Sequence, residues 1–117
     1  MMTRGEQFVE SLRLKHDFYD RHERRSYLRM VEVAKRIVDQ PSLLRAGDAF
    51  LERFARSDPQ QATAYATWKR TLTLSAEEVA RQLLEDSDRG ANLRDTAPVF
   101  VVVPRDELNR AWRAPTP

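Results

Sequence analysis

The chain has 117 residues, 32% of them charged, and a formal net charge of +2, which fits one polar domain rather than a large or strongly basic protein. It contains no cysteine, which excludes disulfides, thiol nucleophiles and cysteine-based zinc sites. No run of about 18 apolar residues is present, which excludes a membrane span, and no signal-peptide core is found near the first residues, so we expect a cytoplasmic protein.

Residues 5–39 carry a helical pattern throughout. Apolar residues recur at steps of three and four along the second half, at positions 27, 30, 31, 34, 37 and 38. In the first half of this segment, the residues spaced to share one helical face are Phe8, Leu12, Lys15 and Tyr19. Between the halves, Asp20 precedes Glu23 by three residues, a pattern typical of a helix start. We expect one long helix or two helices joined near Asp20, with residues 1–23 forming a helical extension of a domain that spans residues 24–113.

The next predicted helix lies between Pro41 and Pro59, because proline suits a first helical turn or a position beyond a helix end. The apolar residues that we expect to form its core face are Leu43, Leu44, Phe50, Leu51 and Phe54. Gly47 lies inside this helix at a cost of roughly 1 kcal/mol relative to alanine, which indicates a close helix crossing.

Two further helices are predicted between residues 60 and 84. The first presents on one face Tyr65, Trp68 and Leu72. In the second, Ser75 precedes Glu78 by three residues, which predicts a capping box in which hydroxyl and carboxylate satisfy reciprocal backbone donors. The residues of this second helix that we expect to face inward are Val79, Leu83 and Leu84.

An acidic stretch follows this helix. The carboxylates of Glu85, Asp86 and Asp88 would oppose the helix dipole, so we expect the helix to stop before them. Asp86 or Ser87 then caps a new short helix that covers Leu93.

The last part of the chain combines an apolar run with a final helix. The run, Val99–Val103, stops against Pro104 and predicts an extended segment, and the helix after it has Leu108, Ala111 and Trp112 on one side. Residues 114–117 are expected to be a frayed tail. The whole pattern predicts an all-α fold, a helical bundle of five to seven helices with one short extended segment near residues 98–103.

The apolar run admits three interpretations. It is a buried plug of the core, or a strand that adds to a partner's sheet or lies in a partner's groove, or an apolar loop of no consequence. A lone strand in a helical protein has no obvious backbone partner, and unpaired buried peptide groups are costly. This favours a protein made for an interaction, with a second copy of the chain or another protein as the partner.

No motif of the chain predicts catalysis. His16 and His22 are six residues apart, which is not the spacing of a shared helix face, so we expect a solvated polar helix there and no metal. A catalytic acidic cluster needs an anion-binding or nucleophilic partner in a shaped pocket, and the chain has no glycine-rich phosphate loop, so we interpret Glu85, Asp86 and Asp88 as a cap or a surface. We expect no enzyme and no cofactor.

Arg21, Arg25 and Arg29 follow one another at steps of four and share one helix face. The simplest interpretation is a solvated face whose aliphatic stems cover the core. The functional interpretation is contact with an acidic partner or with nucleic-acid backbone, although a net charge of +2 is small for a protein driven by phosphate contacts. A helical nucleic-acid-binding regulator that uses this face is therefore the alternative function.

Three segments, "FLERF", "YATWKRTL" and "LLEDSDRGANLRDTAP", occur in an order that resembles a family of small helical bacterial proteins similar to the antitoxins of toxin–antitoxin pairs. The residues that match the pattern are Leu51, Glu52, Arg53, Phe54, Tyr65, Trp68, Asp86, Ser87, Asp88, Arg89, Leu93, Arg94 and Pro98. The family usually continues with Pro-Phe-Ala-Gly, whereas this chain has Val99, Phe100 and Val101 after the proline. If this segment recognises a partner, the departure from the family pattern implies that the partner of this chain differs too.

The resemblance implies a non-catalytic antitoxin-like protein that binds and neutralises a cognate toxin protein. The residues that we expect to bind the partner are Glu85, Asp86, Asp88, Arg89, Arg94, Val99, Phe100 and Val101. We expect the carboxylates to pair with basic active-site residues of the toxin, because a toxin that handles nucleic acid presents such residues. The apolar run would be buried in the complex.

Overall fold

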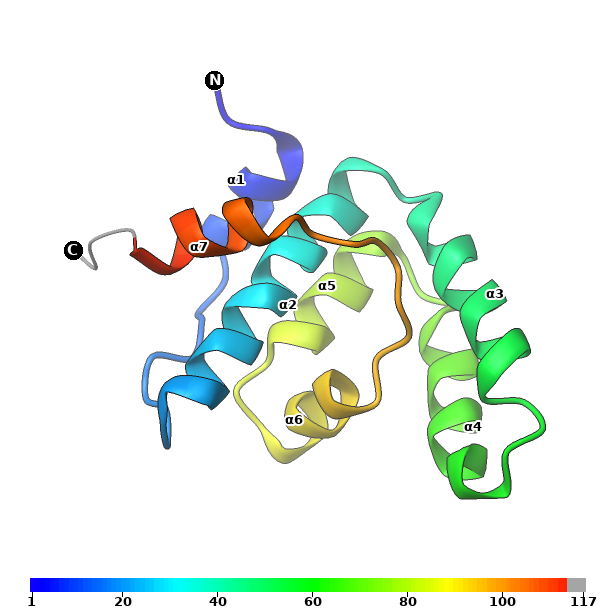
Figure 1. Ribbon diagram of the computed structural model, residues 1–117. Coiled ribbons are helices and arrows are strands. Elements are labelled where there is room, and N and C mark those ends of the chain that lie inside the picture. The colour runs from blue at the N-terminus through cyan, green and yellow to red at the C-terminus, as the bar shows by residue number, and fades with distance from the viewer. Residues whose placement is uncertain (114–117) are drawn as a thin grey trace.

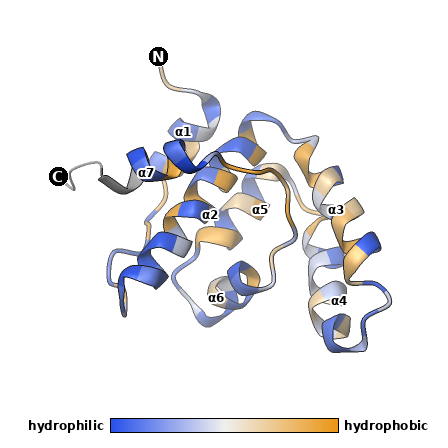
Figure 2. Ribbon diagram, viewed as in Figure 1, coloured by the Kyte–Doolittle hydropathy of each residue, from blue (hydrophilic) through white to orange (hydrophobic). Residues whose placement is uncertain are grey.

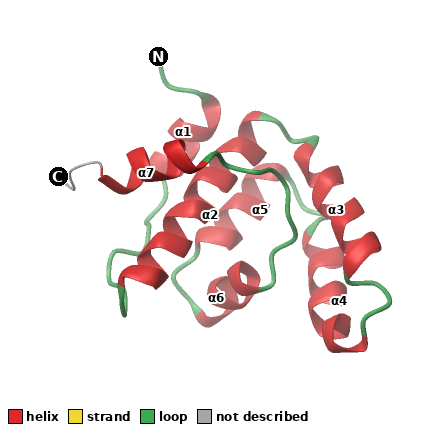
Figure 3. Cartoon of the chain, viewed as in Figure 1, coloured by secondary structure: helices red, strands yellow, loops and turns green. Residues whose placement is uncertain are grey.

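The computed structural model describes residues 1–113, which form an all-α fold without a strand (Figures 1 and 3). Its helices are α1 (Arg4–Glu10), α2 (Arg21–Asp39), α3 (Leu43–Phe54), the short 3-10 helix η1 (Pro59–Gln61), α4 (Ala62–Thr71), α5 (Ala76–Leu84), α6 (Asp88–Asp95) and α7 (Arg105–Arg113). The prediction of a bundle of five to seven helices is confirmed. The expected frayed tail at residues 114–117, and the expected side-chain positions of Ala111 and Trp112, lie outside what is described.

The helices α2 and α5 lie side by side at the centre of the molecule (Figure 1). Helices α1 and α7 pack against α2, and α6 packs against α5. Helices α3 and α4 form a hairpin at one side, where Lys69 of α4 reaches Asp48 and Glu52 of α3 with nitrogen–oxygen distances of 2.6 and 3.1 Å. None of the described helices is long and apolar enough to cross a bilayer.

The core consists of two clusters, because the apolar stripe of α2 is wide enough to face two sides (Figure 2). The first lies between α1, α2 and α5 and buries Val9, Tyr27, Val31, Ala34, Val38, Ala80 and Leu84. The second joins the hairpin to the centre and buries Val33, Ile37, Leu51, Ala55, Trp68, Ala76, Val79, Leu83, Leu93 and Phe100. Trp68 is the largest fully buried side chain of the described residues, and its Nε1 donates to Thr96 Oγ1 at 3.1 Å.

The prediction of helix throughout residues 5–39 is wrong for residues 11–20. Helix α1 ends at Glu10, and α2 begins at Arg21, where the Asp20 carboxylate accepts from the backbone N–H of Glu23 at 2.8 Å, as its cap pattern predicted. The intervening segment folds back onto α2, because the backbone N–H of Lys15 donates to the Tyr27 hydroxyl at 3.1 Å. This contact would be lost in one continuous helix.

Only one half of the capping box predicted at Ser75 and Glu78 is formed. At α5 the Ser75 hydroxyl accepts from the backbone N–H of Glu78 at 3.2 Å, but the Glu78 carboxylate binds Arg81 instead of completing the box. A complete capping box is found at α1, where Thr3 and Glu6 satisfy each other's backbone N–H groups. Arg81, three residues after Glu78, explains the incomplete box at α5, because it binds the Glu78 carboxylate.

Two predictions for α3, the burial of Phe54 and the helix crossing at Gly47, are corrected by the structure. Phe54 is 56% exposed, because it is the last residue of α3 and lies at the far end of the hairpin (Figure 1). Gly47 is buried against the ring of Phe100, and a β-carbon at Gly47 would lie 2.3 Å from Phe100 Cε1. The close approach at this glycine is therefore made by the apolar run and not by a crossing helix.

The apolar run forms neither helix nor strand and crosses the front of the molecule from α6 to α7 (Figure 1). Phe100 is 4% exposed, and its ring meets Trp68 edge-on with a centroid distance of 5.7 Å. Val101 and Val103 are partly buried against the same cluster, whereas Val99 and Val102 are 48% and 80% exposed. Phe100, Val101 and Val103 therefore plug the core, as the first interpretation predicted, whereas Val99 and Val102 are exposed.

Candidate partner-binding site

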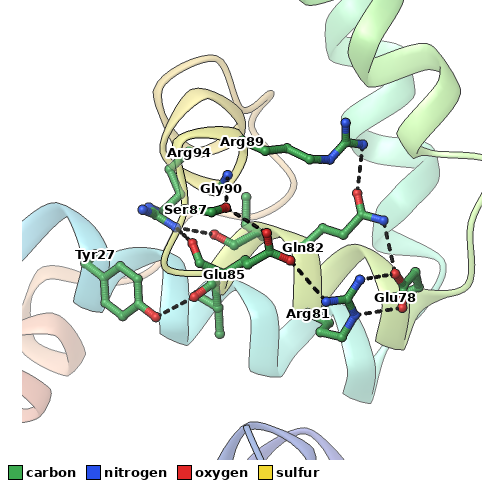
Figure 4. A network of polar contacts seen from close by, with 11 residues as sticks. Tyr27, Glu78, Arg81, Gln82, Glu85, Ser87, Arg89, Gly90 and Arg94 are labelled. Atoms are coloured by element: carbon green, nitrogen blue, oxygen red, sulfur yellow. Dashed lines mark hydrogen bonds and ion pairs between the residues drawn. The ribbon is translucent and has the colours of Figure 1, made fainter. Parts of the chain in front are cut away.

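The turn between α5 and α6 is built around the last carbonyl groups of α5, which have no partner inside the helix. Arg94 of α6 donates from Nη1 to the carbonyl oxygens of Leu83 and Glu85, at 3.1 and 2.8 Å (Figure 4). The Tyr27 hydroxyl donates to the carbonyl of Leu84 at 2.7 Å. The Arg94 guanidinium also lies over the Tyr27 ring, 4.9 Å from its centroid. Arg94 is thus a structural residue that fixes the turn.

The start of α6 is held tightly against the same turn. The Ser87 hydroxyl accepts from the backbone N–H of Gly90 at 3.0 Å, which confirms Ser87 as the cap of the short predicted helix over buried Leu93. A β-carbon at Gly90 would lie 2.0 Å from the carbonyl oxygen of Glu85. Only glycine permits this approach, so the orientation of the acidic turn is set by backbone packing.

The carboxylates of the turn differ in their surroundings, and two of them have partners within the chain. Glu85 accepts from the Ser87 hydroxyl at 2.7 Å and from Arg81 at 3.1 Å, and these hydrogen bonds hold the pKa of Glu85 below its ordinary value (Figure 4). Asp86 lies 3.4 Å from Lys15 Nζ, with its side chain 58% exposed. The exposed Asp88 side chain makes no hydrogen bond or ion pair with the described residues.

A polar groove of about 890 Å³ lies between α2 and α6, and the acidic turn forms one of its edges. Its charged lining consists of Lys15, Asp20, His22, Glu23, Arg29, Asp86, Asp88, Arg94 and Asp95. Arg29 therefore faces the same groove as the acids of the turn, although the sequence suggested that they belong to alternative sites. Arg89 points elsewhere, because its guanidinium donates to Gln82 Oε1 at 3.1 Å (Figure 4).

The backbone of the apolar run and of the two residues before it is open, in the sense that its polar groups have no hydrogen-bond partner among the described residues. Within the described part of the chain, no backbone N–H or carbonyl group of residues 97–103 makes a hydrogen bond. A smaller hollow of about 270 Å³ adjoins the start of the run and is lined in part by Phe50, Phe54, Ala97 and Pro98. The exposed apolar surface near the run therefore includes Phe54, which the sequence pattern had assigned to the core.

The predicted site residues thus separate into two roles. Asp86, Asp88 and Val99 are exposed, whereas Phe100 and Arg94 support the surface from inside. Asp95 lines both the polar groove and the hollow beside the run, so the two parts of the predicted surface adjoin each other along α6. Nothing in the periodicity of α3 separates Phe54 from its buried neighbours, because its exposure results from the position of the helix end.

Within residues 1–113, no three histidine, aspartate or glutamate side chains gather as a metal-binding group. No family model, curated protein or solved structure matches the chain. The function is therefore inferred from the charges, the exposed side chains and the open backbone just described.

Proposed function

We propose that the protein is a cytoplasmic, non-catalytic, antitoxin-like protein that binds and neutralises a partner toxin protein through the apolar run and the acidic turn. The observation that supports this function is the open backbone of residues 97–103, flanked by the exposed side chains of Val99 and Val102. Such a segment suits the addition of a partner's strand, in which backbone hydrogen bonds provide affinity and side-chain pockets provide specificity.

The buried residues of the run make this surface rigid before the partner arrives. Phe100 is anchored against Trp68, and Val101 packs on the same cluster, so the exposed neighbours are held in place. A segment that is already ordered loses less conformational entropy on binding than a flexible loop. Burial of Val99, Val102 and Phe54 then contributes roughly 25 cal/mol for each Å² of apolar surface removed from water.

The acidic turn adds charge to this surface. Asp86 and Asp88 are its exposed carboxylates and are available to basic residues of a toxin, whereas Glu85 is already engaged by Arg81. A charge pair that becomes buried in the complex costs about 2–5 kcal/mol when one side is truncated, and an exposed pair costs under about 1 kcal/mol. We expect Asp86 and Asp88, and not Glu85, to contribute most of the electrostatic part of the binding free energy.

The backbone part of this proposal is tested with the product of the adjacent gene as the untagged partner. Val102→Pro removes one open backbone N–H group, and Val102→Thr retains it with a similarly shaped, β-branched side chain. We expect Val102→Pro to weaken the complex about tenfold or more in calorimetry, while Val102→Thr stays close to the natural chain. Equal affinities for the two variants would show that no strand pairs with this backbone.

The charge part is tested by Asp86→Ala combined with Asp88→Ala. The matched control is Glu10→Ala combined with Asp106→Ala, which removes two exposed acids elsewhere and gives the same change in net charge. We expect the first variant to weaken partner binding about tenfold and to abolish growth rescue in cells that express the partner, and we expect the control to do neither. An equal loss in both variants would mean that only the overall charge matters.

A further inference from the structure

A second groove, of about 600 Å³, lies between α2 and α7 and has an unusual charge balance. Its lining consists of Arg25, Leu28, Arg29, Val103, Arg105, Leu108 and Asn109. Three of these residues are arginines and none is acidic, while the leucines and the valine are partly buried and form an apolar floor. Arg105, which the sequence pattern left unassigned, joins the arginine face of α2 here.

Two of the arginines that line this groove, Arg29 and Arg105, carry the positive charge on which the inference rests. The side chains of Arg29 and Arg105 make no hydrogen bond or ion pair with the described residues. Glu107, the acid of α7 that has an ion-pair partner, reaches Arg36 of α2, which does not line the groove. Arg105 also begins α7, where the helix dipole adds positive potential. Like charges that converge in a hollow raise the local concentration of anions.

We propose that this groove binds an acidic, partly apolar segment of another protein. Guanidinium groups bind carboxylates in a planar, two-pronged geometry, and the apolar floor offers a place for leucine-like side chains between the acids. This occupant matches both halves of the lining, whereas a phosphate backbone would use only the arginines. The inference goes beyond the proposed function, because it concerns a second groove and a ligand of opposite charge. Two residues are shared: Arg29 also lines the polar groove, and Val103 belongs to the apolar run.

Nucleic acid fits the described lining less well. Single-stranded nucleic acid is usually held by aromatic side chains on which the bases stack, and none of the described residues that line this groove is aromatic. The net charge of the chain is only +2, which is small for a protein that depends on the release of counterions from phosphates. Arg21, the third arginine predicted for a nucleic-acid surface, does not line the groove.

The test uses a short fluorescein-labelled peptide in which glutamate and leucine alternate, followed by fluorescence anisotropy. A peptide with lysine in place of glutamate and an oligothymidylate serve as the other probes. The groove variant is Arg29→Glu combined with Arg105→Glu. The matched control is Arg45→Glu combined with Arg70→Glu, which reverses two exposed arginines of α3 and α4 and changes the net charge equally. Circular dichroism verifies that both variants remain folded.

We expect the acidic peptide to bind the natural chain, to lose about tenfold or more in affinity to the groove variant, and to keep its affinity for the control. We expect the lysine peptide not to bind. Failure of the acidic peptide to bind the natural chain would overturn the proposal, as would an equal loss in both variants. Tighter binding of the oligothymidylate, with displacement of the peptide and a steep salt dependence, would assign the groove to nucleic acid instead.

Discussion

The contact between Gly47 and Phe100 leads to a prediction whose sign depends on one side chain. A methyl group introduced by Gly47→Ala would lie 2.3 Å from Phe100 Cε1, so the ring would have to move by about an ångström to reach an ordinary contact. The ring has little freedom to do so, because Phe100 is 4% exposed and lies edge-on against the fully buried Trp68. The new methyl group therefore overpacks the core.

The size of the effect follows from two opposing terms. Overpacking a well-filled core costs typically about 1–3 kcal/mol, whereas alanine in place of a helical glycine stabilises by about 1 kcal/mol. We expect Gly47→Ala to lower the free energy of unfolding by about 1–2 kcal/mol, because the contact is too short for a small adjustment. In a Phe100→Val background the clashing ring atoms are absent, and the same change should stabilise the protein by about 1 kcal/mol.

The assay is urea denaturation followed by tryptophan fluorescence for the four chains of the double-mutant cycle. Ala46→Gly, at the exposed neighbouring position of α3, measures the helix-propensity term alone and should cost about 1 kcal/mol. A stabilising Gly47→Ala in the natural chain would refute the reasoning. So would an identical effect in both backgrounds, because the two sites would then be uncoupled.

Three further predictions concern other parts of the molecule. Tyr27→Phe should lower the free energy of unfolding by about 1–3 kcal/mol in urea denaturation, because the backbone groups of Leu84 and Lys15 lose the hydroxyl; a loss below about 0.5 kcal/mol would mean that water replaces it. Val101→Lys should lower the melting temperature, because Val101 packs against the core. Val102→Lys, at an 80% exposed position, should leave the melting temperature unchanged and should reduce any self-association seen in sedimentation. Equal melting temperatures of the two variants would contradict the different burial of the two valines. Hydrogen bonds from Arg81 and Gln82 lower the pKa of Glu78 from 4.5 to about 2. The ionised carboxylate therefore stabilises the fold above its unfolded pKa, and this contribution is lost as the pH falls toward 2. Glu78→Gln should flatten the acid side of a plot of unfolding free energy against pH, and an unchanged plot would show that this ion pair is not maintained in solution.

The helices and several of their caps could be predicted because these features depend on residues close in sequence. Asp20 and Ser87 satisfy backbone donors within three residues, and the stripe of α2 is visible as a repeat of three and four. Residues 11–20 imitate a helical pattern, but the Tyr27 hydroxyl, which lies a dozen positions beyond Lys15, binds that residue's backbone N–H. A tertiary hydrogen bond of this kind leaves no periodic trace.

The candidate surfaces show the same limit. The exposed aspartates and valines were identifiable as residue types, but which of the valines face outward depends on Phe100 reaching Gly47, fifty-three positions earlier in the chain. Arg105 joins Arg25 and Arg29 only because α7 packs against α2. Spacing along one helix predicted that Arg25 and Arg29 share a face. It could not predict that Arg105, from another helix, lies beside them.

The position of Phe100 late in the chain has a consequence for synthesis on the ribosome. Trp68 and the α3–α4 hairpin are translated well before the residue that closes their cluster. At roughly 5–20 residues per second, the interval between Trp68 and Phe100 lasts about 2–6 seconds, during which an indole and several leucines lack their final cover. We therefore expect chaperones to bind the nascent hairpin, and we expect a chain that ends before Phe100 to keep this apolar surface exposed and to be degraded faster than the whole chain.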